Sequence, residues 1–317
     1  MLYIKSSAAV AAFSLILTTL GYPAASPDTR QTEIDDLLGF DESLKQLHLS
    51  ADDIFPEIRV LDDDDFDIFC KDCIESTAPE EVAPYTVSEE ELQKRFIVGK
   101  DDRKLFNEPS YPYTTVGRLS WSNGVFCSGA LVGPRHVLTA RHCIVENATA
   151  TFSPGFDKTA RLGSGRITTA VHPPRSGSGG CNTKSDWAVA IIDSRLGDQL
   201  GWFGAKYPDR TQLDKPRFTH MGYPGDRDSG KRPYRQTGIT VHSKRTFDCD
   251  ATGPFYTDTD TAGGQSGGPH WETDKNGGKW IWGALSISVR GPKETYAGWS
   301  SGNQMVATIS RLRKEFD

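Results

Sequence analysis

The residues after Tyr111 follow the pattern of short β-strands, and this pattern limits the possible folds more than any other feature of the chain. Apolar or β-branched runs alternate with clusters of Gly, Pro, Ser, Asn and Asp. Many short strands at even spacing are typical of β-barrels and β-sandwiches. Near the C-terminus, apolar residues at Met305, Ile309 and Leu312 predict a short helix over 305–316. The expected strands are Thr114–Leu119, Val137–Ala140, Trp187–Ile192, Gly238–Val241 and Lys279–Ser288.

Charge divides the chain at Arg95. Residues 26–95 contain 21 acidic and 6 basic side chains, a net charge of −15, whereas residues 96–317 carry a net charge of +8. An acidic tract is commonly a solvated tail, but it can also cover a basic domain through charge attraction. The dibasic pair Lys94–Arg95, just before Phe96, favours the second interpretation. We therefore predict an acidic propeptide, 26–95, that a processing protease removes by cutting after Arg95.

The first 25 residues have the pattern of a secretory signal peptide. Lys5 supplies a positive start, and Ala8–Leu20 is an apolar stretch of 13 residues, with cleavage expected near Ala25. This stretch is shorter than the ~20 residues that a membrane-spanning helix needs. The mature protein is therefore expected to be secreted and extracellular, with no attachment to a membrane.

Six cysteines fit an oxidising compartment. Cys127 and Cys143 are both expected on strands that flank the loop of His142, so we predict that they form one disulfide. Cys181 and Cys249 then form the second by elimination.

Two further features concern covalent modification. Cys70 and Cys73 form a Cys-x-x-Cys sequence within 26–95, where a local disulfide or two free thiols are both compatible with the sequence. Asn147–Ala148–Thr149 is an N-glycosylation sequon in the loop after Cys143, so Asn147 is the predicted glycosylation site.

Three residues that suit nucleophilic catalysis occur in the chain order His142, Asp186 and Ser266, at separations of 44 and 80 residues. Each alone has a simpler explanation, as a surface histidine, a capping aspartate or a serine in a turn. A serine hydroxyl needs a base, and that base needs an orienting partner. We therefore predict Ser266 as nucleophile, His142 as general base and then acid, and Asp186 as the carboxylate that fixes the imidazole tautomer. The N–H groups of Gly264 and Ser266 are expected to bind the developing oxyanion.

Other function classes find no support in the sequence. No spacing of His, Cys and Asp suggests a metal site, and no glycine loop suggests a phosphate-binding cofactor. The basic region lacks the interleaved aromatic and basic stripes of a nucleic-acid groove. We therefore expect no cofactor, no metal and no nucleic acid, but a monomer that acts on protein or peptide substrates.

Residues from about 97 to 317 resemble the trypsin-like peptidases, and among them the glutamyl endopeptidase branch. The motifs that carry this resemblance are Val98–Arg103, Tyr111–Tyr113, Gly222–Asp226 and Asp260–Gly267. The resemblance implies an all-β, chymotrypsin-like fold over 96–317, with a short C-terminal helix. Two six-stranded antiparallel β-barrels, over roughly 110–200 and 201–304, would enclose a cleft. His142 and Asp186 would come from the first barrel and Ser266 from the second.

The chain departs from this family at positions that matter for activation and specificity. Trypsin has an aspartate directly before the nucleophile, which pairs with the new N-terminal amine, but this chain has Gln265. The trypsin switch therefore cannot operate. The glutamyl branch relies on a histidine near the end of its pocket wall, whereas residues 283–288 contain none.

The substrate pocket leaves two specificities open. Asp260 lies six residues before Ser266, where trypsin keeps the carboxylate that binds Arg or Lys, although the glutamyl branch shares this Asp-Thr pair. Thr261 and Ser286 are the other candidate pocket residues, and Arg290 is a candidate cation for an acidic side chain. The alternative from another function class is a non-catalytic protease homologue that acts as a binding or effector protein. The intact triad argues against this alternative.

Overall fold

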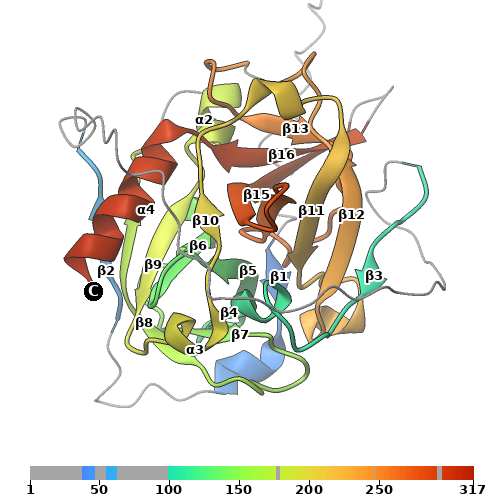
Figure 1. Cartoon of the computed structure of the whole chain (residues 1–317). Coiled ribbons are helices and arrows are strands. Elements are labelled where there is room, and N and C mark those ends of the chain that lie inside the picture. The colour runs from blue at the N-terminus through green and yellow to red at the C-terminus, as the bar shows by residue number, and fades with distance from the viewer. Residues whose placement is uncertain (1–37, 47–54, 63–98, 176–178, 247, 291–294) are drawn as a thin grey trace, which may run out of the picture.

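The computed structural model describes residues 38–46, 55–62, 99–175, 179–246, 248–290 and 295–317. They form two β-sheets that pack against each other, with helix α4 (Asn303–Glu315) beside the first sheet (Figure 1). The predicted all-β fold with a short C-terminal helix is confirmed. The other helical turns within the described residues are short: η1 (Glu42–Gln46), η3 (Tyr113–Thr115), η4 (Arg141–Cys143), α2 (Gly180–Lys184), α3 (Gly197–Leu200), η5 (Arg210–Gln212) and η6 (Asp228–Gly230).

The first sheet contains a closed antiparallel barrel. Its strands follow the order β5-β4-β7-β8-β9-β6, and the pairing of β6 with β5 completes the ring. A closed ring leaves no unpaired strand edge, which suits a stable scaffold for the loops at its rim. The strands are β4 (Val116–Trp121), β5 (Val125–Leu131), β6 (His136–Thr139), β7 (Ala150–Pro154), β8 (Gly165–His172) and β9 (Ala188–Ile192).

The second sheet is curled but open. Its described strands follow the order β13-β16-β15-β14-β11-β12-β3, with β10 parallel to β15, and a single bridge joins Val241 to Thr257. β13 has only three residues, which is too short for a full ladder at this edge. The strands are β3 (Lys104–Leu105), β10 (Gly204–Ala205), β11 (Pro216–Gly222), β12 (Tyr234–Thr240), β13 (Phe255–Thr257), β14 (Pro269–Thr273), β15 (Lys279–Arg290) and β16 (Thr295–Ser301).

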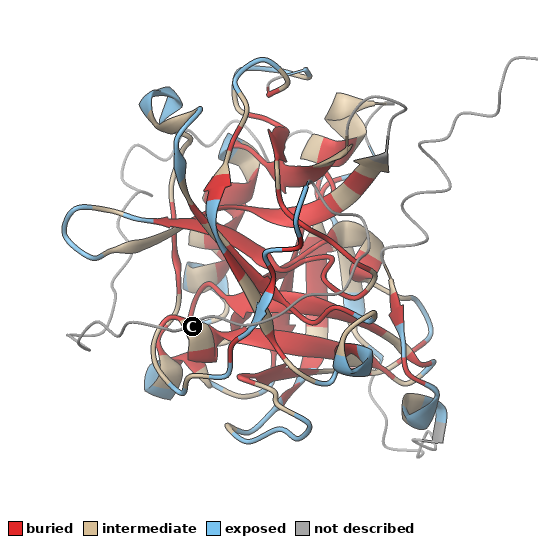
Figure 2. Cartoon of the chain, turned by 90° about the vertical axis from the view of Figure 1, so that its right-hand side faces the viewer, coloured by how far each residue is buried: buried red, intermediate tan, exposed pale blue. Residues whose placement is uncertain are grey.

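Large apolar side chains pack inside each curled sheet and between the two sheets. Buried strands run through the centre of the molecule, and exposed residues lie mainly in loops (Figure 2). Fully burying one such side chain stabilises the fold by about 1.5–3 kcal/mol. The first barrel encloses Leu119, Trp121 and Phe152, the second sheet packs around Phe218, Trp282 and Trp299, and Val189, Trp271, Ile281, Met305 and Ile309 lie between the two.

Each strand predicted from the sequence overlaps an observed strand, with small shifts at the ends. Thr114 and Thr115 belong to the turn η3, so that β4 begins at Val116. The predicted C-terminal helix begins at Asn303 rather than Met305, and its apolar stripe packs into the core. Among the described residues, no helix has the length and apolar character that a membrane crossing requires.

Two pieces of residues 26–95, called the acidic segment from here on, pair with strands of the first barrel. β1 (Gly39–Phe40) lies antiparallel to β5, and β2 (Glu57–Val60) lies parallel to β8, close to α4 (Figure 1). Both pieces therefore add a short strand to the sheet that forms the barrel.

Candidate active site

His142 and Asp186 meet at one rim of the first barrel. His142 follows the end of β6 in the turn η4, and the disulfide between Cys143 and Cys127 ties this turn to β5. Asp186 lies between α2 and β9. Nδ1 of His142 lies 2.6 Å from Oδ2 of Asp186, and the backbone N–H of His142 donates to Oδ1 at 3.0 Å. The two residues predicted to act together are therefore in direct contact.

The carboxylate of Asp186 is buried and held by several donors. Oδ2 accepts a second hydrogen bond from Oγ of Ser286 at 2.6 Å, and Nε of Arg141 lies 3.9 Å from Oδ1. Burial raises the pKa of Asp186, but the charge of His142 and the hydrogen bonds from His142 and Ser286 outweigh burial. The pKa therefore lies below its ordinary value, and Asp186 is ionised at neutral pH.

The contact with Asp186 decides which nitrogen of His142 carries a proton. An ionised carboxylate only accepts hydrogen bonds, so Nδ1 of the neutral imidazole must hold the proton. Nε2 then presents its lone pair, and among the described residues it has no hydrogen-bond partner. This arrangement suits a general base that acts through Nε2.

Ser266 is fully buried and lies in the loop between β13 and β14. The backbone N–H of Ser128 donates to the carbonyl of Ser266 at 2.8 Å. Gly267 has a φ of +78°, and a Cβ at this position would lie 2.1 Å from Oγ1 of Thr139. The loop of Ser266 therefore packs against β5 and the end of β6, and β6 leads directly into the turn of His142.

Gly264 is held in a conformation that only glycine fits. Its φ is +93°, and a Cβ would lie 2.4 Å from the ring of Phe126. Its carbonyl accepts from Oγ of Ser128 at 2.8 Å, and the carbonyl of Gly263 accepts from the N–H of Gly225 at 2.6 Å. Since N–H and C=O point in opposite directions across a trans peptide, the N–H of Gly264 points away from Gly225.

The three candidate pocket residues have different partners. Asp260 is buried, and its Oδ2 accepts from the backbone N–H of Asp102 at 2.8 Å. Thr261 is also buried, and its hydroxyl has no hydrogen-bond partner among the described residues. Ser286 donates to Asp186, as described above. Asp260 is therefore joined to the segment that follows Arg95.

A cavity of about 200 Å³ lies beside His142. One wall comes from β2, in the acidic segment, so that this segment takes part in shaping the space next to the imidazole. Residues lining the cavity include Ile58, His142, Ile144, His172, Asn182 and Ile287. Within the described residues, no group of three or more His, Cys, Asp or Glu side chains is arranged to hold a metal ion.

The disulfides Cys127–Cys143 and Cys181–Cys249 are both present, which confirms the predicted pairing. Cys143 lies in the turn η4 and not on a strand, so one premise of that prediction was wrong.

Asn147 is exposed in a turn with a φ of +56°. The predicted signal peptide 1–25, Cys70, Cys73, the predicted processing site at Arg95 and the side chain of Arg290 lie outside the described residues.

Two contacts around the site were not predicted from the sequence. One is the hydrogen bond from Ser286 to Asp186. A buried carboxylate needs hydrogen-bond donors, and this need could have pointed to a nearby serine. The other is the contact of Arg103 with Gln265, because Asp101–Asp102–Arg103 has the composition of an exposed charged run. Gln265 was the available signal for this contact, because its side-chain amide, directly before the nucleophile, needs a hydrogen-bond partner.

The fold and this site define a trypsin-type protein. Residues 105–301 match the family model described as Trypsin, which covers more than half of the chain. The chain belongs to the trypsin family.

Curated relatives resemble part of this chain. A protein named Glutamyl endopeptidase, from Bacillus licheniformis, is 32% identical over 198 residues, which cover 60% of this chain and 57% of that protein. A protein of Bacillus subtilis named Extracellular metalloprotease is 25% identical over 183 residues, which cover 52% of this chain and 58% of that protein. The matched region therefore spans somewhat more than half the length of these relatives.

Solved structures show the same fold. A Glu endopeptidase in complex with MPD superposes with a TM-score of 0.56 at 23% identity, covering 69% of this chain and 99% of that chain. A structure described as HBP gives a TM-score of 0.53 at 17% identity, covering 69% of this chain and 97% of that chain. At these identities the likeness supports the fold alone.

Proposed function

We propose that this protein is a secreted serine endopeptidase, a hydrolase made as a zymogen, with His142, Asp186 and Ser266 as its catalytic triad. One observation carries the proposal. Nδ1 of His142 is bound to an ionised, buried Asp186, which leaves Nε2 with no partner among the described residues. Membership of the trypsin family supports the same reaction class.

In the proposed mechanism, Oγ of Ser266 attacks the carbonyl carbon of the scissile peptide bond while Nε2 of His142 accepts the hydroxyl proton. The tetrahedral intermediate collapses, His142 gives that proton to the leaving amine, and the acyl group remains on Ser266 as an ester. A water molecule then attacks the ester and passes a proton to His142, which returns it to Ser266. Asp186 stabilises the imidazolium formed in each half-reaction.

The N–H groups of Gly264 and Ser266 would stabilise the oxyanion of both intermediates. The orientation of the peptide between Gly263 and Gly264 supports this role, since the carbonyl of Gly263 is bound by Gly225 on the opposite side. Loss of one oxyanion donor typically lowers kcat by ~10²–10³-fold. The glycine at 264 is needed because a Cβ would meet the ring of Phe126.

The acidic segment, 26–95, would act as a propeptide that docks on the first barrel. Two anchors support this role. At the first, Asp41 and Arg118 form an ion pair of 2.9 Å with both side chains largely buried, next to the pairing of β1 with β5. At the second, β2 lies along β8, and Ile58 lines the cavity beside His142. A processing protease would release the segment by cutting after Arg95.

The structural role of Asp260 argues against cleavage after Arg or Lys. A carboxylate that binds a substrate cation must face the pocket, whereas Asp260 accepts a hydrogen bond from Asp102 in the segment after Arg95. The similarity to a protein named Glutamyl endopeptidase supports cleavage after glutamate instead. Thr261 remains the candidate pocket residue.

We also propose that the enzyme is extracellular and monomeric and acts on proteins or peptides, and three features support the extracellular location. The sequence begins with the predicted signal peptide 1–25, and the two disulfides suit an oxidising compartment. Asn147 is exposed, as a glycosylation site requires.

Cleavage of a peptide library by protein processed at Arg95 tests the proposal. Cuts that disappear in Ser266→Ala would support the triad, and their position relative to Glu, Asp, Arg or Lys would give the specificity. If the Ser266→Ala variant keeps the full biological effect of the wild-type protein, the alternative is favoured, namely a non-catalytic homologue that acts by binding.

A further inference from the structure

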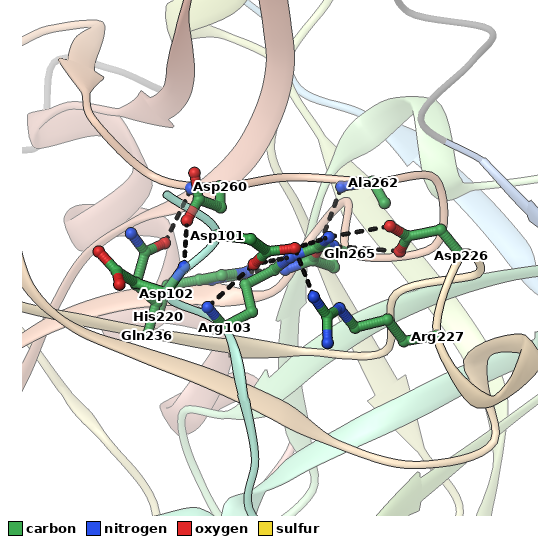
Figure 3. A network of polar contacts seen from close by, with 10 residues as sticks. All are labelled: Asp101, Asp102, Arg103, His220, Asp226, Arg227, Gln236, Asp260, Ala262 and Gln265. Atoms are coloured by element: carbon green, nitrogen blue, oxygen red, sulfur yellow. Dashed lines mark hydrogen bonds and ion pairs between the residues drawn. The ribbon is translucent and has the colours of Figure 1, made fainter. Parts of the chain in front are cut away.

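Arg103 is buried in the centre of a polar network that lies next to the loop of Ser266 (Figure 3). None of its side chain is exposed to solvent. Its guanidinium binds Asp101, with Nη2 at 2.9 Å from Oδ2, and Asp226, with Nη2 at 2.8 Å from Oδ2. Nη1 also donates to Oε1 of Gln265 at 2.8 Å. Arg103 thus links the segment after Arg95 to the residue directly before the nucleophile.

The side chain of Gln265 is fixed at both ends of its amide. Oε1 accepts from Arg103 and from the backbone N–H of Ala262 at 2.9 Å, while Nε2 lies 3.0 Å from Nε2 of His220. His220 Nδ1 lies 3.0 Å from the carbonyl of Pro269, which can only accept, so Nδ1 carries the proton and Nε2 accepts from Gln265. Burial, together with the charge of Arg103, lowers the pKa of His220 to about 4, so this tautomer is neutral.

The Gln265 side chain in turn closes the loop on itself. The backbone N–H of Gln265 donates to the carbonyl of Ala262 at 3.1 Å, while Ala262 donates to Oε1 of Gln265. These reciprocal bonds fix the backbone that leads through Gly264 to Ser266. Because Oε1 of Gln265 accepts from both Ala262 and Arg103, movement of this side chain would disturb the loop.

The charges of the network explain why position 265 is a glutamine. Around the guanidinium of Arg103, the two cations Arg103 and Arg227 face two carboxylates, Asp101 and Asp226, with Arg227 bound to Asp101 at 2.6 Å. The buried carboxylate of Asp260 lies at the other end of the network, where it accepts from the backbone N–H of Asp102. A neutral amide adds an acceptor for Arg103 without adding charge. An aspartate at 265 would leave one buried carboxylate without a balancing cation, which costs several kcal/mol.

We propose that Arg103 is a positioning residue that holds the loop of Gly264 and Ser266 through the side chain of Gln265. It thereby takes the place of the N-terminal amine that organises this loop in trypsin. The proposal rests on the function proposed above for this loop. Arg103 is an internal side chain, so its cation exists before the chain is cut after Arg95. Processing then opens the site by releasing the acidic segment, while the loop is already formed in the precursor.

Four variants of the processed protein, compared with wild type, test the role of Arg103. Arg103→Met removes the contact with Gln265, and we expect kcat to fall about 100-fold, similar to the loss of one oxyanion donor, with KM changed less than about threefold. Arg103→Lys keeps the charge and should recover part of kcat. Arg227→Met removes a cation of the same network that is bound to Asp101 at 2.6 Å, and should keep kcat within about threefold.

The fourth variant guards against simple misfolding. Arg103→Met leaves an excess buried carboxylate, whereas Arg103→Met combined with Asp226→Asn restores the balance of one cation and one carboxylate. We expect this double variant to fold and still to show the loss of kcat. Recovery of wild-type kcat in the double variant, or an equal loss in Arg227→Met, would show that charge balance and not the contact with Gln265 matters.

Amide hydrogen exchange separates this inference from the proposed function. In the double variant we expect the amides of residues 262–267 to exchange at least about tenfold faster than in wild type, even if Ser266 proves to have no peptidase activity. Unchanged exchange would overturn the role of Arg103. Absence of Ser266-dependent cleavage in wild type, with faster exchange in the variant, would instead refute only the proposed function.

A last variant tests whether the new amine is needed. A processed chain extended by Gly-Ser before Phe96 displaces the amine but leaves Arg103 in place. We expect kcat to stay within about twofold and its profile between pH 8 and pH 10 to be unchanged, since a free amine has a pKa of about 7.7–8.0. A loss of kcat above about tenfold would show that the amine, and not Arg103, organises the loop.

Discussion

Substitution of Asp41 by Asn should weaken the binding of the acidic segment to the first barrel. Asp41 Oδ2 accepts from Nη2 of Arg118 at 2.9 Å, and Oδ1 accepts from the hydroxyl of Ser43 at 2.6 Å. Arg118 is 3% exposed and stacks over the ring of Phe126, with its guanidinium carbon 4.3 Å from the ring centre. The amide in Asp41→Asn keeps the shape of the side chain but leaves the cation of Arg118 without its countercharge.

The expected effect follows from the burial of this pair. Removing one partner of a buried ion pair costs about 3–5 kcal/mol, because the other charge remains buried without compensation. Arg118 becomes solvated once the segment leaves, so we take the lower end of this range. A loss of about 3 kcal/mol corresponds to an increase of about 100-fold in the inhibition constant.

Inhibition of mature enzyme by added segment 26–95 measures this effect. Glu42→Gln is a matched control, because Glu42 is exposed in the same turn η1 and pairs only with Lys45 among the described residues. We expect Glu42→Gln to change the inhibition constant less than about threefold. The ratio between Asp41→Asn and wild type should persist at about 1 M salt, because buried pairs are screened little. Equal inhibition by wild type and Asp41→Asn would refute the role of this anchor.

The same carboxyl makes docking depend on pH. Burial raises the pKa of Asp41, but hydrogen bonds from Ser43 and Arg118, with the charge of Arg118, outweigh burial and hold the pKa below its ordinary value of 3.8. A group with a lowered pKa in the docked state contributes its full docking free energy above the pKa of the free segment. This contribution is lost as the pH falls through the docked pKa. We therefore expect inhibition to weaken below about pH 3.8, and less so in Asp41→Asn.

Three further predictions concern the catalytic domain. Ser286→Ala should lower kcat by less than about tenfold and the free energy of unfolding by about 1.5–3 kcal/mol, since His142 still binds Asp186; a loss of kcat as large as in His142→Ala would contradict this. Gln265→Asp should lower the melting temperature and kcat, measured by calorimetry and peptide hydrolysis, because it adds a buried carboxylate. Replacing Cys127 and Cys143 by Ser removes their disulfide and should lower the free energy of unfolding, measured in urea, by about 2–4 kcal/mol. An unchanged free energy of unfolding would contradict the role of this disulfide in fixing η4.

The sequence predicts the parts of the structure that depend on local patterns. Alternating apolar runs placed strands at 114–119 and 137–140, and the apolar stripe of Met305, Ile309 and Leu312 placed the last helix. These signals survive because side-chain burial follows the period of the element. The division of the strands between two antiparallel barrels came only through the resemblance to a known family.

Contacts between distant segments were less predictable. The pairing of β1 with β5 and of β2 with β8 joins pieces far apart in sequence, and strands of two and four residues carry too little pattern to specify a partner. The same limit applies to Arg103, which is buried only because Asp101, Asp226 and Gln265 surround it. A charged run is read as exposed unless its partners are known. The second sheet also remains open where a full barrel was expected.

Reaction with a fluorophosphonate probe tests the central claim most directly. The probe forms a covalent adduct only with an activated nucleophile that has an oxyanion site. For protein processed at Arg95, we predict stoichiometric labelling at Ser266, abolished in Ser266→Ala and strongly slowed in His142→Ala, together with Ser266-dependent peptide cleavage. Processed, folded protein that is not labelled at Ser266 and cleaves no peptide would contradict the account.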